Sequence, residues 1–345
     1  MIDDPVLVED WHPVVLAAQL ADGGPVAARV LGEDLVVWSS GGQYFAWRDL
    51  CVHRGTRLSL GRVVDGGRLE CPYHGWTYGT DGRCLLMPAH PEQTPPAKAC
   101  VATYHAAEAN GVIWVSLGTG AQSIPKFALL DDAAYQVLLA GPYRVKASAP
   151  RIVENFLDIG HFPFVHEGIL GDRARPEIDD YTTTIGPEGV LSEGVKVFQP
   201  DPYATGHGSI VTYTYRVHRP LSASFIKHGE HSFGMLLSVT PHDEVDSTAW
   251  MWMAMNYEPQ SPMVEFQDRI FAQDRPILES QRPEMLPARP TGGAAPSQRQ
   301  DRHRLSTLAS RARGANRRVV ASSGQDRAGR GERRARIPRN RYGPF

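Results

Sequence analysis

Two short segments of the chain each pair a cysteine with a nearby histidine. Cys51 and His53 lie in "CVHRG", and Cys71 and His74 lie in "CPYHGW", with seventeen residues between His53 and Cys71. Zinc could bind these four side chains, but structural zinc sites usually pair cysteine with cysteine and histidine with histidine. A Rieske two-iron two-sulfur cluster needs two thiolates on one iron and two imidazoles on the other. The mixed pairs supply this division and indicate such a cluster.

A second pair of histidines lies in "ENFLDIGHFPFVH", where His161 and His166 are five residues apart. An ideal helix would place them about 140° apart around its axis, which is poor for binding one ion. Pro163 lacks the N–H that would bond back to the carbonyl of Ile159, so we expect the helix to kink or loosen between the histidines. Both rings could then converge on one metal. The alternative is two unrelated histidines in a helix.

A single ferrous ion is often held by two histidines and one carboxylate on one face, so the two histidines would need a carboxylate as the third ligand. The segment "VEFQDRIFAQDRPILESQ" offers two aspartates, Asp268 and Asp274. Asp274 falls at helical spacing on a mostly apolar face, where an unpaired carboxylate would be costly. This face is predicted to contain Met263, Gln267, Ile270, Asp274, Ile277 and Gln281. Asp268 falls on another face, so we predict that Asp274 is the ligand and that Asp268 is solvated.

The two cysteine–histidine motifs with their seventeen-residue spacer resemble the ligand loops of Rieske non-haem iron oxygenases. The segment "DIGHFPFVH" resembles the mononuclear iron motif of the same family. The resemblance implies that the cluster is held by Cys51, His53, Cys71 and His74. It also implies a ferrous ion held by His161, His166 and Asp274.

Asp158 lies three residues before His161, where the family has an aspartate between two metal centres. The resemblance implies that this carboxylate accepts hydrogen bonds from His161 and from His74 of a neighbouring subunit. A carboxylate in this position would orient both imidazoles and couple the two centres. The chain is therefore expected to form a ring, usually a homotrimer.

By the same resemblance, electrons reach the cluster from a separate NADH-linked flavin and iron–sulfur reductase, and the iron then activates O2. The chain looks closest to the phthalate dioxygenase and vanillate O-demethylase branch. Those enzymes hydroxylate substituted aromatic acids or ethers, or oxidise a methyl group that is then lost, in aromatic catabolism. A Rieske electron carrier without oxygenase activity is the competing function, but a carrier would not need the second motif.

The expected fold is α+β in two parts. Residues 1–125 are predicted to form an all-β cluster domain, because short β segments are separated by Gly-Gly and Asp-Gly turns. Residues 126–287 are predicted to form the catalytic domain, with helices at 151–166 and 262–282 and an antiparallel sheet. In the strand "AWMWMAMNY", tryptophans and methionines alternate. Either face could line an aromatic pocket, but an ordinary sheet core is favoured for these residues.

Charge is distributed unevenly along the chain. Residues 288–345 hold 15 arginines and three acids, a net charge of +12, so residues 1–287 carry −14 of the total of −2. We predict no catalytic role for this arginine-rich tail, and a shifted reading frame is favoured over a disordered basic segment as its origin. The acidic body makes nucleic acid an unlikely partner. The lack of a signal-like start or a long apolar run predicts a cytoplasmic protein without a membrane span.

Overall fold

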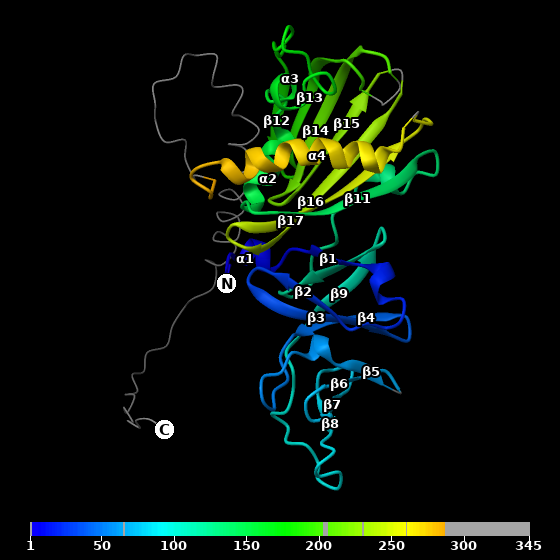
Figure 1. Cartoon of the computed structure of the whole chain (residues 1–345), viewed down its shortest axis with the longest axis vertical. Coiled ribbons are helices and arrows are strands. Elements are labelled where there is room, and N and C mark those ends of the chain that lie inside the picture. The colour runs from blue at the N-terminus through cyan, green and yellow to red at the C-terminus, as the bar shows by residue number, and fades with distance from the viewer. Residues whose placement is uncertain (1, 65, 203–205, 230, 260, 287–345) are drawn as a thin grey trace, which may run out of the picture.

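The computed structural model describes residues 2–64, 66–202, 206–229, 231–259 and 261–286. Within them are three antiparallel sheets (Figure 1). Two belong to the first part of the chain, where the four-stranded sheet is inserted between two strands of the six-stranded sheet, and the seven-stranded sheet, against which helices lie, follows them. This arrangement confirms the α+β fold expected from the sequence, with an all-β first part and a mixed second part. The arginine-rich tail, whose origin and role were predicted from the sequence, lies outside the described residues.

The first part of the chain contains two sheets. The six-stranded sheet has the order β1-β10-β9-β4-β3-β2, and the four-stranded sheet has the order β5-β6-β7-β8. Their bounds are β1 His12–Leu16, β2 Val26–Val30, β3 Glu33–Ser40, β4 Gln43–Arg48, β5 Arg62–Val64, β6 Arg68–Glu70, β7 Thr77–Tyr78, β8 Cys84–Leu86, β9 Thr103–Ala109 and β10 Val112–Ser116. A short helix, α1 (Pro5–Val8), precedes them. Gly41 and Gly42 both have positive φ in the β3–β4 turn, as a two-residue hairpin with the primed turn geometry requires.

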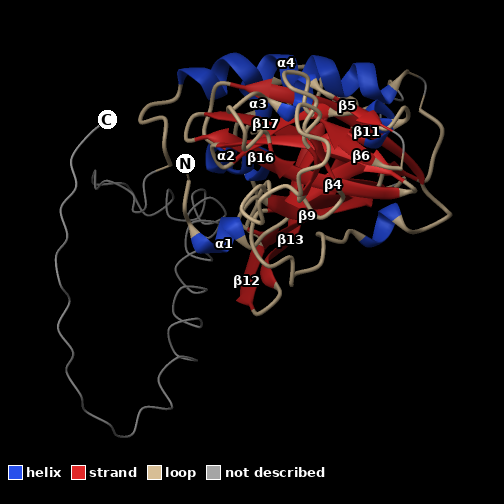
Figure 2. Ribbon diagram, turned by 90° about the horizontal axis from the view of Figure 1, so that it is seen from below, coloured by secondary structure: helices blue, strands red, loops and turns tan. Residues whose placement is uncertain are grey.

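The second part is built on one seven-stranded sheet of order β11-β17-β16-β15-β14-β13-β12. Its strands are β11 Gln136–Val145, β12 Thr182–Gly186, β13 Gly189–Gln199, β14 Ser209–Arg219, β15 Ser222–His228, β16 Phe233–Asp243 and β17 Asp246–Met255. Helix α4 (Met263–Ser280) crosses this sheet, and α2 (Ala149–Leu157) packs beside it. Figure 2 shows α4 running along one side of the stacked strands.

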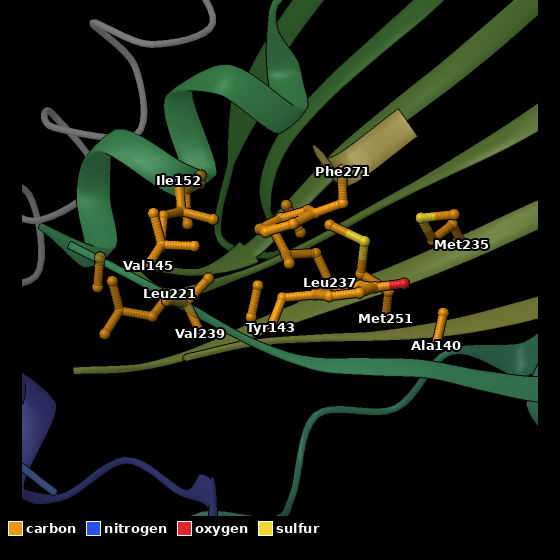
Figure 3. Packing of buried hydrophobic residues seen from close by; sticks show 14 of the residues in the cluster. Ala140, Tyr143, Val145, Ile152, Leu221, Met235, Leu237, Val239, Met251 and Phe271 are labelled. Carbon is orange, nitrogen blue, oxygen red and sulfur yellow. The ribbon is translucent and has the colours of Figure 1, made fainter. Parts of the chain in front are cut away.

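Strand β17 explains how the two parts of the chain meet. Its methionines, among them Met251, belong to the apolar core between the sheet and the helices (Figure 3). The tryptophans point the other way, and Trp252 stacks on Trp114 of β10 with ring centroids 5.4 Å apart. The indole of Trp252 also donates to the carbonyl of Asn110 at 2.9 Å. One face of β17 therefore faces the helices, and the other joins the catalytic sheet to the first part of the chain.

The segment 151–166 differs from the single kinked helix that the sequence predicted. Helix α2 ends at Leu157, and a separate short helix, α3 (Phe162–Val165), begins after His161. Pro163 lies in the first turn of α3, where its missing N–H would have no partner in any case. The break thus comes before His161 rather than between the two histidines, and α3 itself holds both rings on one side.

Helix α4 agrees with the predicted segment, with a shift at its end. Met263, Gln267, Ile270 and Asp274 are buried as expected, but Ile277 is 44% exposed and Leu278 is buried in its place. Gln281 follows the helix as its C-cap.

Between β10 and β11 the chain crosses from one part to the other, and the predicted boundary at residue 125 lies in this connection. In the part of the chain that the structure describes, no helix is both long and apolar enough to cross a membrane.

Candidate functional site

The two cysteine–histidine loops have the same backbone hydrogen bonds. In the first, the Gly55 N–H donates to the carbonyl of Cys51 and the Cys51 N–H donates to the carbonyl of Thr56, at 2.9 and 2.8 Å. In the second, the corresponding bonds run from Gly75 to Cys71 and from Cys71 to Trp76, at 3.1 and 2.8 Å. Both glycines have positive φ, which a side chain would strain. The same turn therefore follows each cysteine, with the histidine two residues after Cys51 and three residues after Cys71.

These loops bring the four predicted ligands together. The two cysteines are buried and close enough for their thiols to interact, and the rings of His53 and His74 lie 4.6 Å apart. Burial raises the pKa of the Cys71 thiol, although backbone N–H groups of Tyr73 and His74 point at its sulfur and oppose the shift. His74 is exposed. Buried thiols with N–H donors and outward imidazoles fit the ligand division of a Rieske cluster.

Two aromatic residues around the cluster loops were missed by the sequence analysis. The hydroxyl of Tyr78 lies 3.0 Å from Sγ of Cys51, both groups being buried. The indole ring of Trp76 stacks on His53 with centroids 4.4 Å apart and an interplanar angle of 3°. A tyrosine seven residues after a ligand cysteine, in "CPYHGWTY", was the available signal for the first contact.

The three predicted ligands of the mononuclear iron site, His161, His166 and Asp274, also lie close together. Nε2 of His161 and Nε2 of His166 lie 3.1 Å apart, and Oδ1 of Asp274 lies 3.4 and 3.1 Å from them. Three ligands on one face of an octahedral ion, each about 2.1 Å from the metal, would have donor atoms about 3.0 Å apart. The triangle of two imidazole nitrogens and one carboxylate oxygen therefore has the dimensions of such a site. The ligand atoms of His161, His166 and Asp274 all lie within 4.8 Å of one another, as a single metal ion would require.

Electrostatics within this triangle favour a cation. Burial would raise the pKa of Asp274, but hydrogen bonds with His161 and His166 and their positive potential lower it to about 2. Burial would lower the pKa of His161, whereas the carboxylates of Asp158 and Asp274 raise it to about 9. Asp274 is 7% exposed, so the carboxylate is held nearly dry and needs a positive partner.

The outer nitrogens of the two histidines have different surroundings. The Nδ1–H of His166 donates to Oε1 of Gln273 at 2.8 Å, which leaves Nε2 as the nitrogen with a free electron pair. Nδ1 of His161 lies 3.6 Å from Oδ2 of Asp158, beyond hydrogen-bond distance. The side chain of Asp158 is 50% exposed, and its other oxygen accepts the Gly160 N–H at 2.7 Å. Asn155 donates to Oδ1 of Asp274 at 3.2 Å.

Asp268, the alternative third ligand, lies elsewhere. Its carboxylate accepts a hydrogen bond of 2.5 Å from the Tyr143 hydroxyl, and burial together with this contact raises the tyrosine pKa. Asp268 is exposed, so the geometry favours Asp274 as the sequence predicted.

A pocket adjoins the three donors and is lined mainly by aromatic and methionine side chains. The residues around it include Phe156, Phe162, Tyr213, Phe225, Lys227, Phe233, Met235, Met251, Met263 and Phe266. The free volume between them is about 70 Å³. A cavity that accepts benzene is about 150 Å³, so entry of an aromatic ring requires side chains to move. Three methionines line this space, and methionine adapts its shape easily.

Comparison with known proteins agrees with the fold and both motifs. Residues 10–105 match the family model of the Rieske [2Fe-2S] domain, and residues 145–324 match that of the vanillate O-demethylase oxygenase C-terminal domain. The second match continues past residue 287, the predicted end of the catalytic domain, into the arginine-rich tail.

Several characterised relatives are similar over most of the chain. Methylxanthine N1-demethylase NdmA of Pseudomonas putida is 34% identical over 292 residues, which cover 81% of this chain and 82% of that protein. Methylxanthine N3-demethylase NdmB of the same organism is 29% identical over 299 residues, covering 81% and 83%. The structure of NdmA with caffeine superposes with a TM-score of 0.80 at 27% identity and covers 97% of this chain and 100% of that one. The structure of dicamba monooxygenase bound to dicamba superposes with a TM-score of 0.71 at 20% identity and covers 92% of this chain and 99% of that one. At this identity the likeness concerns the fold alone.

The fold and the paired motifs define an oxidoreductase of the Rieske oxygenase class, with a Rieske [2Fe-2S] domain at its N-terminal end. Within that class, the chain belongs to the terminal oxygenases of the vanillate O-demethylase-like branch.

Proposed function

We propose that the chain removes a methyl group from an oxygen or nitrogen atom of a substituted aromatic compound, using O2 and electrons from an NADH-linked flavin and iron–sulfur reductase. The observation that carries the proposal is the triangle of His161, His166 and Asp274 beside an aromatic pocket. The similar proteins NdmA and NdmB are methylxanthine N-demethylases, which supports the loss of a methyl group here.

The proposed site residues follow the sequence analysis. Cys51, His53, Cys71 and His74 would hold the two-iron two-sulfur cluster, and His161, His166 and Asp274 would hold ferrous iron. A bound ferrous ion with open coordination positions would activate O2. The overall change is R–X–CH3 + O2 + NADH + H⁺ giving R–XH + HCHO + H2O + NAD⁺, in which one oxygen atom enters formaldehyde and the other enters water. Hydroxylation of a ring carbon is the other outcome that the same donor set would support.

The protein's own contribution to this reaction is to position the substrate and exclude water. Phe156, Phe162 and Phe266 are among the rings that border the three donor residues. Aromatic side chains favour a flat aromatic substrate through burial and ring contacts. Because Gln273 holds His166 and Asn155 contacts Asp274, two of the three donors keep their orientation when the substrate moves nearby side chains.

Electron delivery is best explained by an assembly of several chains. In Figure 1 the four-stranded sheet that carries the cluster loops lies at one end of the molecule, and α3 lies toward the other, with the six-stranded sheet between them. The exposed Asp158, beside His161, and the exposed His74 are both placed to meet another subunit. These positions support a homotrimer in which His74 of one chain contacts Asp158 of the next.

A Rieske electron carrier is the second candidate function. It would use the cluster loops in the same way, but it would have no use for a buried carboxylate 3.1 Å from a histidine nitrogen beside an aromatic pocket. We therefore favour an oxygenase over an electron carrier as the function of this chain.

The direct test combines the iron-loaded protein with a ferredoxin-type NADH reductase, O2 and a panel of methoxy- and N-methyl-aromatic compounds, and measures formaldehyde. Formaldehyde should appear in proportion to NADH consumed. The Asp158→Asn variant should keep its metals but turn over about 10–100-fold more slowly. NADH-dependent reduction of the cluster without any consumption of O2, whatever the aromatic compound, would instead establish the electron carrier.

A further inference from the structure

Three methionine side chains border the same pocket as the three metal-binding candidates. Met235 of β16, Met251 of β17 and Met263 of α4 are 4%, 5% and 5% exposed, so bulk solvent hardly reaches them. The free volume beside them, about 70 Å³, is less than half of a cavity that accepts benzene. A thioether accepts an oxygen atom readily and becomes a sulfoxide. The pocket therefore combines oxidisable groups with the proposed site of O2 activation.

Helix α4 carries one of these thioethers and one of the metal-binding candidates on the same face. Met263 and Asp274 are eleven residues apart, about three turns of helix, and both are buried and line the pocket. On the sheet side, Met235 and Met251 belong to the core between the sheet and the helices (Figure 3). When no substrate lies in the pocket, thioethers on both of its sides therefore face the proposed metal site.

One of the three thioethers has a hydrogen-bond donor. Nε2 of Gln267 donates to Sδ of Met251 at 3.3 Å, and both side chains are buried. The sulfur lone pair that accepts this N–H is also the pair that would attack an oxygen atom, so the contact lowers the reactivity of Met251. Within the described residues, no donor contacts the sulfur of Met235 or Met263. These two methionines are therefore the more reactive ones.

We propose that the protein oxidises its own pocket methionines, Met235 and Met263, when it activates O2 without an aromatic substrate. The inference rests on the proposed function, because it uses the same O2 and the same two electrons from the NADH-linked reductase. The reaction is R–S–CH3 + O2 + NADH + H⁺ giving R–S(O)–CH3 + H2O + NAD⁺. The O–O bond breaks and an S–O bond forms, and the sulfur and NADH each supply two of the four electrons that O2 takes up.

Oxidation of these side chains would inactivate the pocket. Each sulfoxide brings a polar oxygen into a space lined mainly by aromatic and methionine side chains. An aromatic substrate would then bind less tightly, because its entry would bury that oxygen without a donor. Methionine sulfoxide reductases reverse the change. The protein would thus lose activity when its substrate runs out and regain it after repair.

The test reads the position of the added oxygen rather than turnover. Iron-loaded protein is reduced by NADH with a ferredoxin-type reductase and mixed with catalase and O2 labelled with the heavy oxygen isotope, without an aromatic compound. Mass spectrometry with peptide fragmentation then assigns the label to individual methionines. Label should appear at Met235 and Met263, and a compound that yields formaldehyde should suppress it. Asp274→Ala should carry no label at either position.

The chain's other methionines serve as controls. Met253 and Met255 are as buried as the pocket methionines, but the described residues that line the pocket do not include them, so they should stay unlabelled. Met285 is 47% exposed and therefore reports any peroxide that escapes into solution. Metal-free protein treated with hydrogen peroxide should show the opposite order, with Met285 oxidised before Met235 and Met263.

The variant Gln267→Leu tests the protection of Met251. Without the N–H donor, Met251 should join the labelled positions. Gln281→Leu, at the C-cap of the same helix, should leave the pattern of label unchanged. A Gln267→Leu variant in which Met251 stays unlabelled would show that the hydrogen bond does not protect this sulfur.

Three results would overturn self-oxidation of the pocket. They are absence of label from both Met235 and Met263, label that appears first at Met253 or Met285, and label that persists in Asp274→Ala. Failure of the proposed function has a different signature. Label at the pocket methionines without formaldehyde from any methyl compound would refute demethylation alone, whereas formaldehyde without label would refute self-oxidation alone.

Discussion

Nδ1 of His166 lies 2.8 Å from Oε1 of Gln273, the residue that directly precedes Asp274 on α4. One turn of helix thus supplies a carboxylate to the proposed metal site and also the amide that orients a histidine of that site. Because Oε1 is an acceptor, His166 carries its proton on Nδ1 and directs Nε2 toward the other two donors.

Replacing Gln273 by leucine should weaken iron binding without unfolding the protein. Loss of the acceptor frees the His166 ring to rotate, and removal of such a partner typically lowers metal affinity about 10–100-fold. Competition between the protein and a ferrous chelator measures the change. Gln273→Glu keeps an acceptor and should retain most of the affinity. Equal iron affinity in Gln273→Leu and the wild type would show that the contact does not hold the ring.

Replacing Tyr78 by phenylalanine should lower the reduction potential of the cluster. The hydroxyl lies 3.0 Å from the sulfur of Cys51, and a donor to a ligand sulfur stabilises the more electron-rich, reduced state. Loss of a hydrogen bond worth about 1.4 kcal/mol between the two oxidation states corresponds to a change of about 60 mV for one electron. A redox titration followed by EPR gives the value. An unchanged or raised potential would contradict this role of Tyr78.

Asp246 should contribute to stability at neutral pH but not in strong acid. It accepts hydrogen bonds from Arg144 at 2.7 and 3.1 Å and from Lys146 at 2.7 Å, and the Arg144 contact is the main cause that lowers its pKa from 3.8 to about 2. Since the folded-state pKa is lower than the unfolded value, this contribution is complete above about pH 4 and is lost as the pH falls toward 2.

The Asp246→Asn variant tests this dependence. Both cations are largely exposed, so solvent screening limits the expected loss to roughly 1–2 kcal/mol at pH 7. Urea unfolding of the wild type and the variant across pH 2–7 should show a gap in unfolding free energy that narrows below pH 4. A gap that stays constant with pH would mean that the asparagine disturbs packing rather than charge.

Local patterns explain why much of the site was predictable. Cys51 and His53, like Cys71 and His74, are proposed ligands that lie close together in sequence, so their spacing indicates the chemistry directly. The expected strand "AWMWMAMNY" became part of β17 because its residues favour a buried, pleated surface. Asp274 was predicted as the third ligand because its helical face is otherwise mostly apolar.

Features that depend on contacts between distant segments were not predictable in the same way. The pairing of His166 with Gln273 joins residues 107 positions apart, and nothing in either local sequence specifies it. Lys227 is the last residue but one of an ordinary strand sequence, "SASFIKH", and only the strand's position in the middle of the sheet explains why this lysine is buried. The helix break before His161 was placed too late because a proline in the first turn of a new helix resembles a proline that kinks an existing one.

The most direct test of the central claim is the content of iron and acid-labile sulfide per chain, measured on protein purified without air and resupplied with ferrous iron. We predict about three irons and two sulfides for the wild type, and about two of each for Asp274→Ala, which keeps the cluster loops intact. Two irons and two sulfides in both proteins would contradict a mononuclear site at His161, His166 and Asp274, and zinc without sulfide would contradict the cluster as well.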